Sequence, residues 1–250
     1  MTTEGQTPVL GLKIGTKLAV ICILISMVAV STAAVLAGYS SNLALKRAAF
    51  EKLTAVRELK AQQIENYFSQ VRNEMTFVSE DASLKGVLQE LRQGVVYLKT
   101  FSDLATPESQ EKLSRHYLDN FLPQYEASSG SKADKALIES LLPQDPLAIF
   151  LQDRYISNQR ELNEVKFENF YGSAFSKVDQ SLSEFKKRFG FYDVFLIEPD
   201  DGRIVYSVER EIDFGTSLLN GPHSNTNLAR AVISAMAASP GQVIFADFEP

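Results

Sequence analysis

Cysteine, histidine and tryptophan are scarce in this chain of 250 residues, and each scarcity excludes a class of site. A single cysteine, Cys22, excludes an intrachain disulfide bond and any metal site built from several thiolates. The two histidines, His116 and His223, lie far apart in the sequence and propose no metal site. The net charge of −6 argues against nucleic acid as a partner, because phosphate binding needs clustered lysine and arginine. We therefore expect no metal, no cofactor and no nucleic acid.

Charged side chains are absent from Leu18 to Leu45, and most of this run is strongly apolar. A helix crosses the hydrocarbon core of a bilayer with about 20 mainly apolar residues, and all its backbone groups are bonded internally. The sequence therefore predicts an N-terminal tail over residues 1–13 and a transmembrane helix over residues 14–38. A cleaved signal peptide is the alternative, although its apolar region is typically about 7–15 residues.

Basic residues flank the apolar run on both sides. Lys13 and Lys17 precede it, and five basic residues follow it: Lys46, Arg47, Lys52, Arg57 and Lys60. By the positive-inside rule, a count of these charges alone places the following domain in the cytoplasm. Long domains, however, cross membranes largely regardless of charge. The charges therefore leave the orientation open.

Proline is absent from Ser40 to Gln93, and Gly86 is the only glycine there. Apolar residues recur in steps of three and four from Phe50 to Val78, with charged residues between them. This pattern predicts a long amphipathic helix over residues 39–93. Val56, Ile64, Val71 and Val78 suit either packing against a second copy of the helix or an intrachain core.

Prolines and glycines divide the remaining sequence into shorter elements. Residues 94–190 read as a helical region, with Thr106 as a cap before Pro107. Tyr192–Glu198 and Arg203–Val208 read as a β-hairpin around a Pro-Asp-Asp-Gly turn. A helix over Thr226–Ala238 and a strand over Gln242–Phe248 complete an α+β region at residues 191–250. Three strands make a thin sheet, so we expect a truncated domain.

Three blocks within Arg188–Val232 resemble a known family: FGFYDVFLIEPDDGRIVYSV, EIDFGTSLLNGP and the following helix NLARAV. They are similar to the membrane-distal part of a double Cache sensor, which has a PAS-like mixed α/β fold with an antiparallel sheet. Such sensors occur in bacterial methyl-accepting chemotaxis proteins and related transducers. LKAQQIENYFSQVRNEM and IFLQDRYISN resemble the same family's signalling helix and the helices that follow it.

The resemblance implies a dimeric receptor in the inner (plasma) membrane. The first span enters from the cytoplasm, and the sensor lies in the periplasm or outside the cell. The expected partners are a small-molecule ligand or a periplasmic binding protein, the lipid bilayer and a second copy of the chain.

Seven residues are candidates for a ligand site, by their position in a Cache fold or by their chemistry. Arg154, beside Tyr155 in an apolar helix, suits a carboxylate ligand, and an ion pair with Asp153 or Glu161 is its alternative. The others are polar groups near the hairpin and later elements: Tyr192, Asp193, Tyr206, Asp213 and Asp247. Their alternative roles are turn caps and core aromatics.

The amino-acid-binding subset of the family uses a tryptophan, which this chain lacks. An acidic group at Glu198, Asp200 and Asp201 reads as a solvated turn rather than a cation site.

Catalytic signatures are absent: the sequence has no P-loop, GxSxG, HExxH or glycine-rich dinucleotide loop. We therefore expect no enzyme in these residues. The leading hypothesis is the ligand-sensing, membrane-anchored N-terminal part of a chemotaxis receptor. The alternatives are the sensor of a membrane-bound nucleotide cyclase, histidine kinase or phosphatase, and a membrane-anchored coiled-coil scaffold that senses no ligand.

Overall fold

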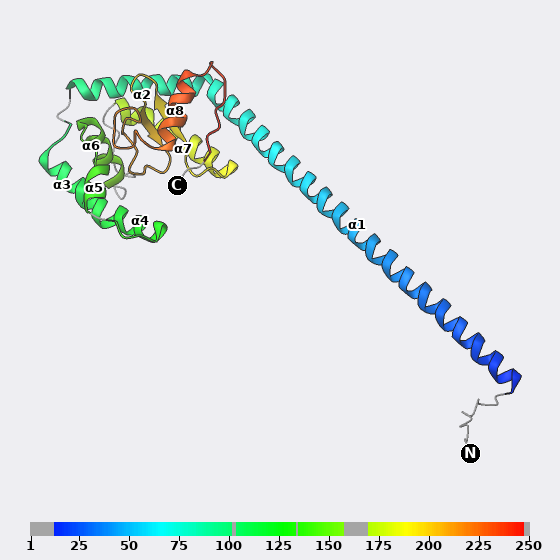
Figure 1. Ribbon diagram of the computed structural model, residues 1–250. Helices are drawn as coiled ribbons and strands as arrows, with labels where there is room; N and C mark the ends of the chain where they lie inside the picture. Colours follow the sequence, from blue (N-terminus) through cyan, green and yellow to red (C-terminus); the bar gives the residue numbers. More distant parts are fainter. Residues whose placement is uncertain (1–12, 102–103, 134, 158–169, 248–250) are drawn as a thin grey trace. The chain divides into compact units, whose positions relative to one another are not determined.

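The computed structural model describes residues 13–101, 104–133, 135–157 and 170–247. The chain divides into two units, residues 1–70 and residues 71–250. Most of the described residues are helical, and one small antiparallel sheet lies in the second unit (Figure 1). This agrees with the expected α+β class. Apart from Lys13, the expected N-terminal tail lies outside the described residues.

The first unit consists of most of helix α1, Ile14–Glu80. Every described residue from 13 to 70 is exposed, including large apolar side chains on all sides of the helix. Its N-terminal part is long and apolar enough to cross a membrane. The expected span is therefore present as a helix that buries nothing within the chain.

The long helix expected over residues 39–93 is interrupted at Asp81. Helix α1 ends at Glu80, and α2 runs from Ala82 to Phe101. The Asp81 carboxylate accepts a hydrogen bond from the Leu84 N–H (2.8 Å), which is how a helix N-cap satisfies an otherwise unpaired donor. The interruption is therefore a local capping signal that the apolar periodicity does not reveal.

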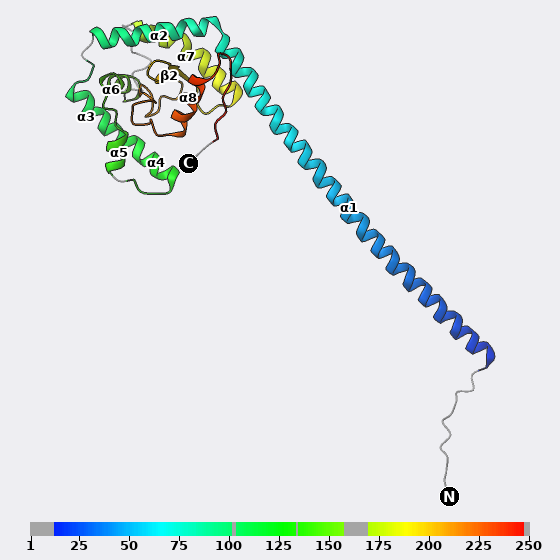
Figure 2. The same ribbon diagram turned by 45° about the horizontal axis from the view of Figure 1, so that its top comes forward.

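The main core of the second unit lies between α2, the sheet and helix α7, Phe170–Phe189. Helix α7 lies alongside α2 in both Figures 1 and 2. The two helices approach closely at Gly94, where a Cβ atom would lie 2.7 Å from the Tyr171 Cα. Five rings from three elements and one loop meet in this core: Tyr155, Tyr171, Phe175, Tyr206 and Phe214.

A smaller core joins the helices that follow α2, and Figure 2 shows them as a group. They are α3 (Pro107–His116), η1 (Tyr117–Phe121), α4 (Leu122–Ser129), α5 (Lys135–Leu141) and α6 (Pro146–Gln152). The next element, η2 (Asp153–Ser157), packs into the main core through Tyr155 and Ile156. The predicted Thr106 cap is confirmed: its hydroxyl accepts the Ser109 N–H, and Pro107 opens α3. Leu113, Tyr117, Ile138 and Ile149 form the buried centre of the group.

The predicted hairpin is confirmed as β1 (Phe195–Glu198) and β2 (Arg203–Ser207). The register pairs Phe195 with Ser207 and Glu198 with Arg203, and it shifts between Leu196 and Ile197. Gly202 has a φ of 65°, a conformation that favours glycine at the turn. All residues of β2 are buried, so the hairpin turn and the start of β2 are held in a defined position.

The region after β2 differs from the expected three-stranded sheet. A loop segment bonds to the free edge of β2 through Ile204 N–H to Thr216 O (3.1 Å) and Gly215 N–H to Ile204 O (3.0 Å). Helix α8, Asn227–Ala237, is confirmed with Thr226 as its cap. The predicted strand Gln242–Phe248 is wrong over residues 242–247, which have no regular structure. Within the described residues no strand lies beside this segment to complete a ladder, and Phe248 lies outside the described residues.

Candidate functional site

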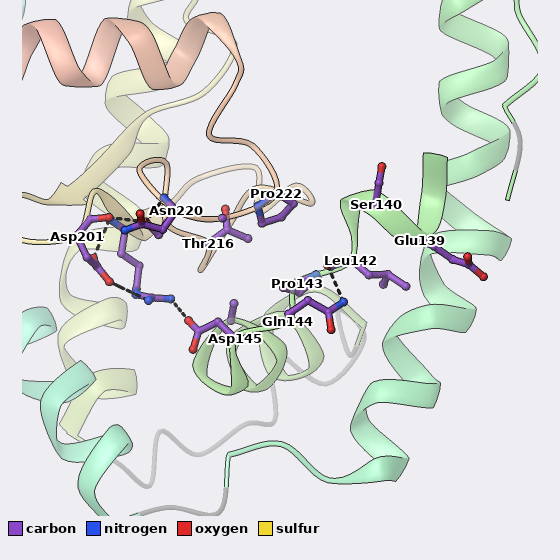
Figure 3. Close-up of a pocket in the computed structure, with 14 residues that line it drawn as sticks. Glu139, Ser140, Leu142, Pro143, Gln144, Asp145, Asp201, Thr216, Asn220 and Pro222 are labelled. Carbon is purple, nitrogen blue, oxygen red and sulfur yellow. Dashed lines mark hydrogen bonds and ion pairs between the residues drawn. The ribbon is translucent and has the colours of Figure 1, made fainter. Parts of the chain in front are cut away.

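A cavity of about 420 Å³ lies where three segments of the second unit meet (Figure 3). We call it the Arg203 cavity. The segments are the α5–α6 connection, the hairpin turn and the loop after β2. Its described lining residues are Glu139, Ser140, Leu142, Pro143, Gln144, Asp145, Ala148, Asp201, Arg203, Thr216, Ser217, Asn220, Gly221 and Pro222. Ligand sites typically combine such a concave shape with apolar walls and a few convergent polar groups.

Local sequence signals place each wall. Pro143 follows the end of α5, and Pro146 opens α6 with Asp145 as its cap. The Asp145 carboxylate accepts the Leu147 N–H at 3.3 Å. On the opposite wall the Ser217 hydroxyl donates to Asp201 O (2.5 Å), and the Gly221 N–H donates to Ser217 O (2.8 Å). A Cβ atom at Gly221 would lie 2.4 Å from Ser217 O, so this tight loop requires glycine.

Arg203 joins the three segments through its guanidinium, and only 6% of its side chain is exposed. Nε and Nη2 donate to Asp201 Oδ2 at 3.1 and 2.8 Å. Nη1 donates to Gly215 O at 2.8 Å and also to the Asp145 carboxylate. The guanidinium therefore bonds to both Asp201 and Asp145, which are labelled in Figure 3. A buried charge of this kind is held only when partners satisfy it on several sides.

Two carboxyl groups near Arg203 have pKa values that are shifted in opposite directions. Burial alone would raise the pKa of Asp201, but the charge and hydrogen bonds of Arg203 hold that pKa below its ordinary value. Burial raises the pKa of Glu198 at the end of β1. Helix α2 also contacts this turn, through Arg92 to Glu198 (3.1 Å) and Asp200 (2.6 Å), and through Lys99 to Asp201 (4.0 Å). The hairpin turn therefore links the cavity wall to α2.

None of the seven residues predicted as ligand contacts is among the described residues that line the Arg203 cavity. Tyr155 and Tyr206 lie in the aromatic core, on either side of Phe175 at ring distances of 4.9 and 4.7 Å. The Tyr206 hydroxyl donates to Asp179 at 3.0 Å, and burial raises the pKa of Tyr155 to about 12. Arg154 is exposed on η2.

Asp193 organises the start of the hairpin. Its carboxylate accepts the Val208 N–H (3.0 Å), the Glu209 N–H (3.1 Å) and the Ser207 hydroxyl (2.7 Å). These bonds match its alternative role as a turn cap. Asp247 is exposed, and its backbone carbonyl accepts a hydrogen bond from the Asn227 side chain.

Tyr192 lines a second cavity of about 520 Å³, which we call the Tyr192 cavity. Its other described lining residues include His116, Asn120, Tyr125, Arg210 and Glu211. The Tyr192 hydroxyl donates to the Glu211 carboxylate, and this bond is the main reason why the pKa of Tyr192 rises to about 12.

Asp213 lies in the loop after β2, beside a buried polar network. Tyr117 and Gln152 share this network: the Tyr117 hydroxyl donates to Gln152 Oε1 (2.9 Å), and Gln152 Nε2 donates to Ile212 O (2.7 Å) and Phe214 O (2.8 Å). Asp213 Oδ1 is buried with no hydrogen-bond partner among the described residues. Burial, followed by the charges of Glu211 and Asp193, raises the pKa of Asp213 to about 7.

The sequence interpretation missed the residues that build the Arg203 cavity. One signal was present, because Arg203 is a charged residue at the start of an otherwise apolar and β-branched strand. Asp145 before Pro146 was a second signal, since it is a typical helix start. Within the part of the chain that the structure describes, no three His, Cys, Asp or Glu side chains converge as a metal site. Comparisons with protein-family models, curated proteins and solved structures found no match to this chain.

Proposed function

We propose that this chain is the membrane-anchored, ligand-sensing N-terminal part of a bacterial transmembrane signal transducer of the chemotaxis-receptor type. In this proposal α1 anchors the chain in the inner membrane, and a small molecule binds the second unit outside the cytoplasm. The observation that carries the proposal is the Arg203 cavity, in a chain whose first helix is long and apolar enough to cross a membrane. The resemblance to Cache sensors supports the same function.

The hairpin turn offers a route by which binding changes a helix. Asp201 lines the cavity, and Arg92 and Lys99 of α2 pair with the same turn. A ligand that favours one position of the turn shifts the population toward it. We infer that α2 responds to that shift through these ion pairs, and that α1 passes the response to the membrane. A second copy of the chain, packed along α1, completes the proposed receptor.

A ligand screen tests the sensing function. The full chain is placed in lipid nanodiscs, and its thermal unfolding is followed by the near-ultraviolet circular dichroism of the buried tyrosines. Amino acids, organic acids, amines and purines are added one class at a time. A ligand at 100 times its Kd stabilises the native state by about 2.7 kcal/mol. A folded domain with no shift from any class contradicts sensing and favours a scaffold.

Two matched variants locate the ligand. Asn220 lines the Arg203 cavity, and Asn120 lines the Tyr192 cavity. Asn220→Ala should weaken binding of the active ligand, whereas Asn120→Ala should leave it unchanged. The reverse pattern would move the site to the Tyr192 cavity.

A charge in the span tests the anchor. Val28 lies within the apolar run and is exposed on α1. Val28→Lys should release part of the chain from membranes during alkaline extraction, because lysine at the centre of a span costs about 2.5–3.5 kcal/mol. Val28→Leu is the control and should stay in the membrane fraction. Equal retention of both variants argues against this segment as the anchor.

A further inference from the structure

The charges that line the Arg203 cavity are unequal. Two carboxylates, Asp145 and Asp201, bond to one guanidinium, that of Arg203. A third lining carboxylate, Glu139, is 61% exposed. Two lysines lie nearby but outside the described lining: Lys135 pairs with Glu139 (3.4 Å), and Lys99 lies 4.0 Å from Asp201. Both lysines and Glu139 are well exposed, so water screens their charges, and surface pairs of this kind contribute little. Around Arg203 the lining therefore has two carboxylates for one guanidinium.

Arg203 has little capacity left for an incoming anion. Its Nε, Nη1 and Nη2 atoms already donate to Asp201, Asp145 and Gly215 O. A carboxylate ligand would have to replace one of these acceptors while lying near the remaining carboxylates. Like charges at such distances repel, and a displaced buried carboxylate would lose its partner. The cavity therefore disfavours acids.

Asp145 keeps open capacity for a cation. Its side chain is 42% exposed, whereas that of Arg203 is 6% exposed. Its described hydrogen bonds are a long one from the Leu147 N–H (3.3 Å) and one from Arg203. Two carboxylate oxygens have about four acceptor sites, so Asp145 can accept further hydrogen bonds. Between Asp145 and Glu139, Figure 3 shows Leu142 and Pro143 beside the cavity, with Pro222 on the facing loop.

We propose that the Arg203 cavity binds a small organic cation, an aliphatic amine whose ammonium group bonds to Asp145 and whose carbon chain lies against Leu142, Pro143 and Pro222. This inference rests on the proposed sensing function and names the ligand class of the same site. Charge-assisted hydrogen bonds from the ammonium supply orientation, and burial of the methylene groups supplies additional affinity.

A series of probes with one carbon skeleton tests the proposal. Calorimetric titration of the full chain in phosphatidylcholine nanodiscs compares 1,4-diaminobutane, 1,4-butanediol and succinate, with empty nanodiscs as the blank. The diamine should bind at least about tenfold more tightly than the diol, because charged hydrogen bonds are the stronger kind, and succinate should not bind. Affinity for the diamine should fall as salt is raised. Tighter binding of succinate or of the diol overturns the proposal.

Substitutions of single acidic residues test which carboxylate contacts the ammonium group of the ligand. Asp145→Asn removes the charge and keeps the helix cap, because asparagine caps as well as aspartate. This variant should weaken diamine binding about tenfold, and Glu139→Gln should weaken it less. Glu184→Gln, on the exposed face of α7, should not change it. Unchanged binding by both cavity variants overturns the proposal. If Asp145→Asn does not fold, Glu139→Gln and the probe series still decide.

The two proposals fail in different ways. Absence of diamine binding, together with stabilisation by another class in the broad screen, refutes the amine and keeps the sensor. Absence of stabilisation by every class refutes both.

Discussion

Helix α1 and the second unit contain similar large apolar side chains, but they bury them to very different degrees. Phe50 in α1 is 70% exposed, whereas Phe175 in α7 is 2% exposed and touches four other rings. Both lie at helical spacing in the sequence. The comparison teaches that periodicity predicts a helix but not what covers it. An apolar helix that the chain itself leaves open needs lipid or another protein around it.

The largest expected difference between the two regions comes from one substitution made in each. Phe175→Ala should lower the free energy of unfolding of the second unit by about 3–5 kcal/mol, because it leaves a cavity among Tyr155, Tyr171 and Tyr206. Phe50→Ala should change it by less than about 0.5 kcal/mol. Urea titration followed by tyrosine circular dichroism measures both. Equal losses would mean that α1 is packed against a partner as firmly as α7 is in the core.

A buried and an exposed arginine allow the same comparison between the two regions for charged side chains. Arg203→Gln should destabilise the second unit by about 3 kcal/mol, because it leaves Asp201 and Asp145 without their shared cation. Arg57→Gln in α1 should have almost no effect, since Arg57 and Glu58 are exposed and 3.8 Å apart. The same urea titration checks both variants. A small effect at Arg203 would show that the cavity tolerates its loss and that its network is not structural.

The smallest effect is a pH dependence confined to the second unit. The pKa of Asp213 is raised to about 7 in the folded chain from an ordinary value of 3.8. Between these values the folded state binds more protons than the unfolded state, so stability falls as pH rises. Because Asp213 is partly open to water, we expect a loss of only about 1 kcal/mol between pH 5 and pH 7.5 relative to Asp213→Asn.

Urea titrations of both proteins at the two pH values measure this difference. The comparison with the variant removes the contributions of other titrating groups, including His223, whose pKa is lowered by burial. Parallel curves would contradict the raised pKa.

Elements with strong local signals were predictable from the sequence. The apolar run, the Thr106–Pro107 helix start and the Pro-Asp-Asp-Gly hairpin turn all formed as expected. Two features were not. The helix break at Asp81 depends on one capping bond within a good helical pattern, and residues 242–247 have a strand pattern without a strand to pair with. A strand needs a neighbour, and its own residues do not supply one.

The candidate site residues also divide into those whose role the sequence predicted and those whose role it did not. Asp193 was recognised as a polar group at the hairpin, and its alternative role as a turn cap matches its bonds. Tyr206 matches its alternative role as a core aromatic, with its hydroxyl bonded to Asp179, and Tyr155 lies among the same rings. Arg203 and Asp145 are 58 residues apart, and the local signal at each of them does not show that the two side chains meet.

The sequence by itself determined where this chain is apolar for a membrane's length, where the helix after Thr106 begins and where the hairpin turns. These are properties of a few adjacent residues: their hydrophobicity, their caps and their backbone preferences. Only the tertiary structure decided that Asp145, Asp201, Arg203 and Gly215 meet around one guanidinium. That meeting depends on the packing of α6, the hairpin and the following loop, and no short stretch of sequence contains it.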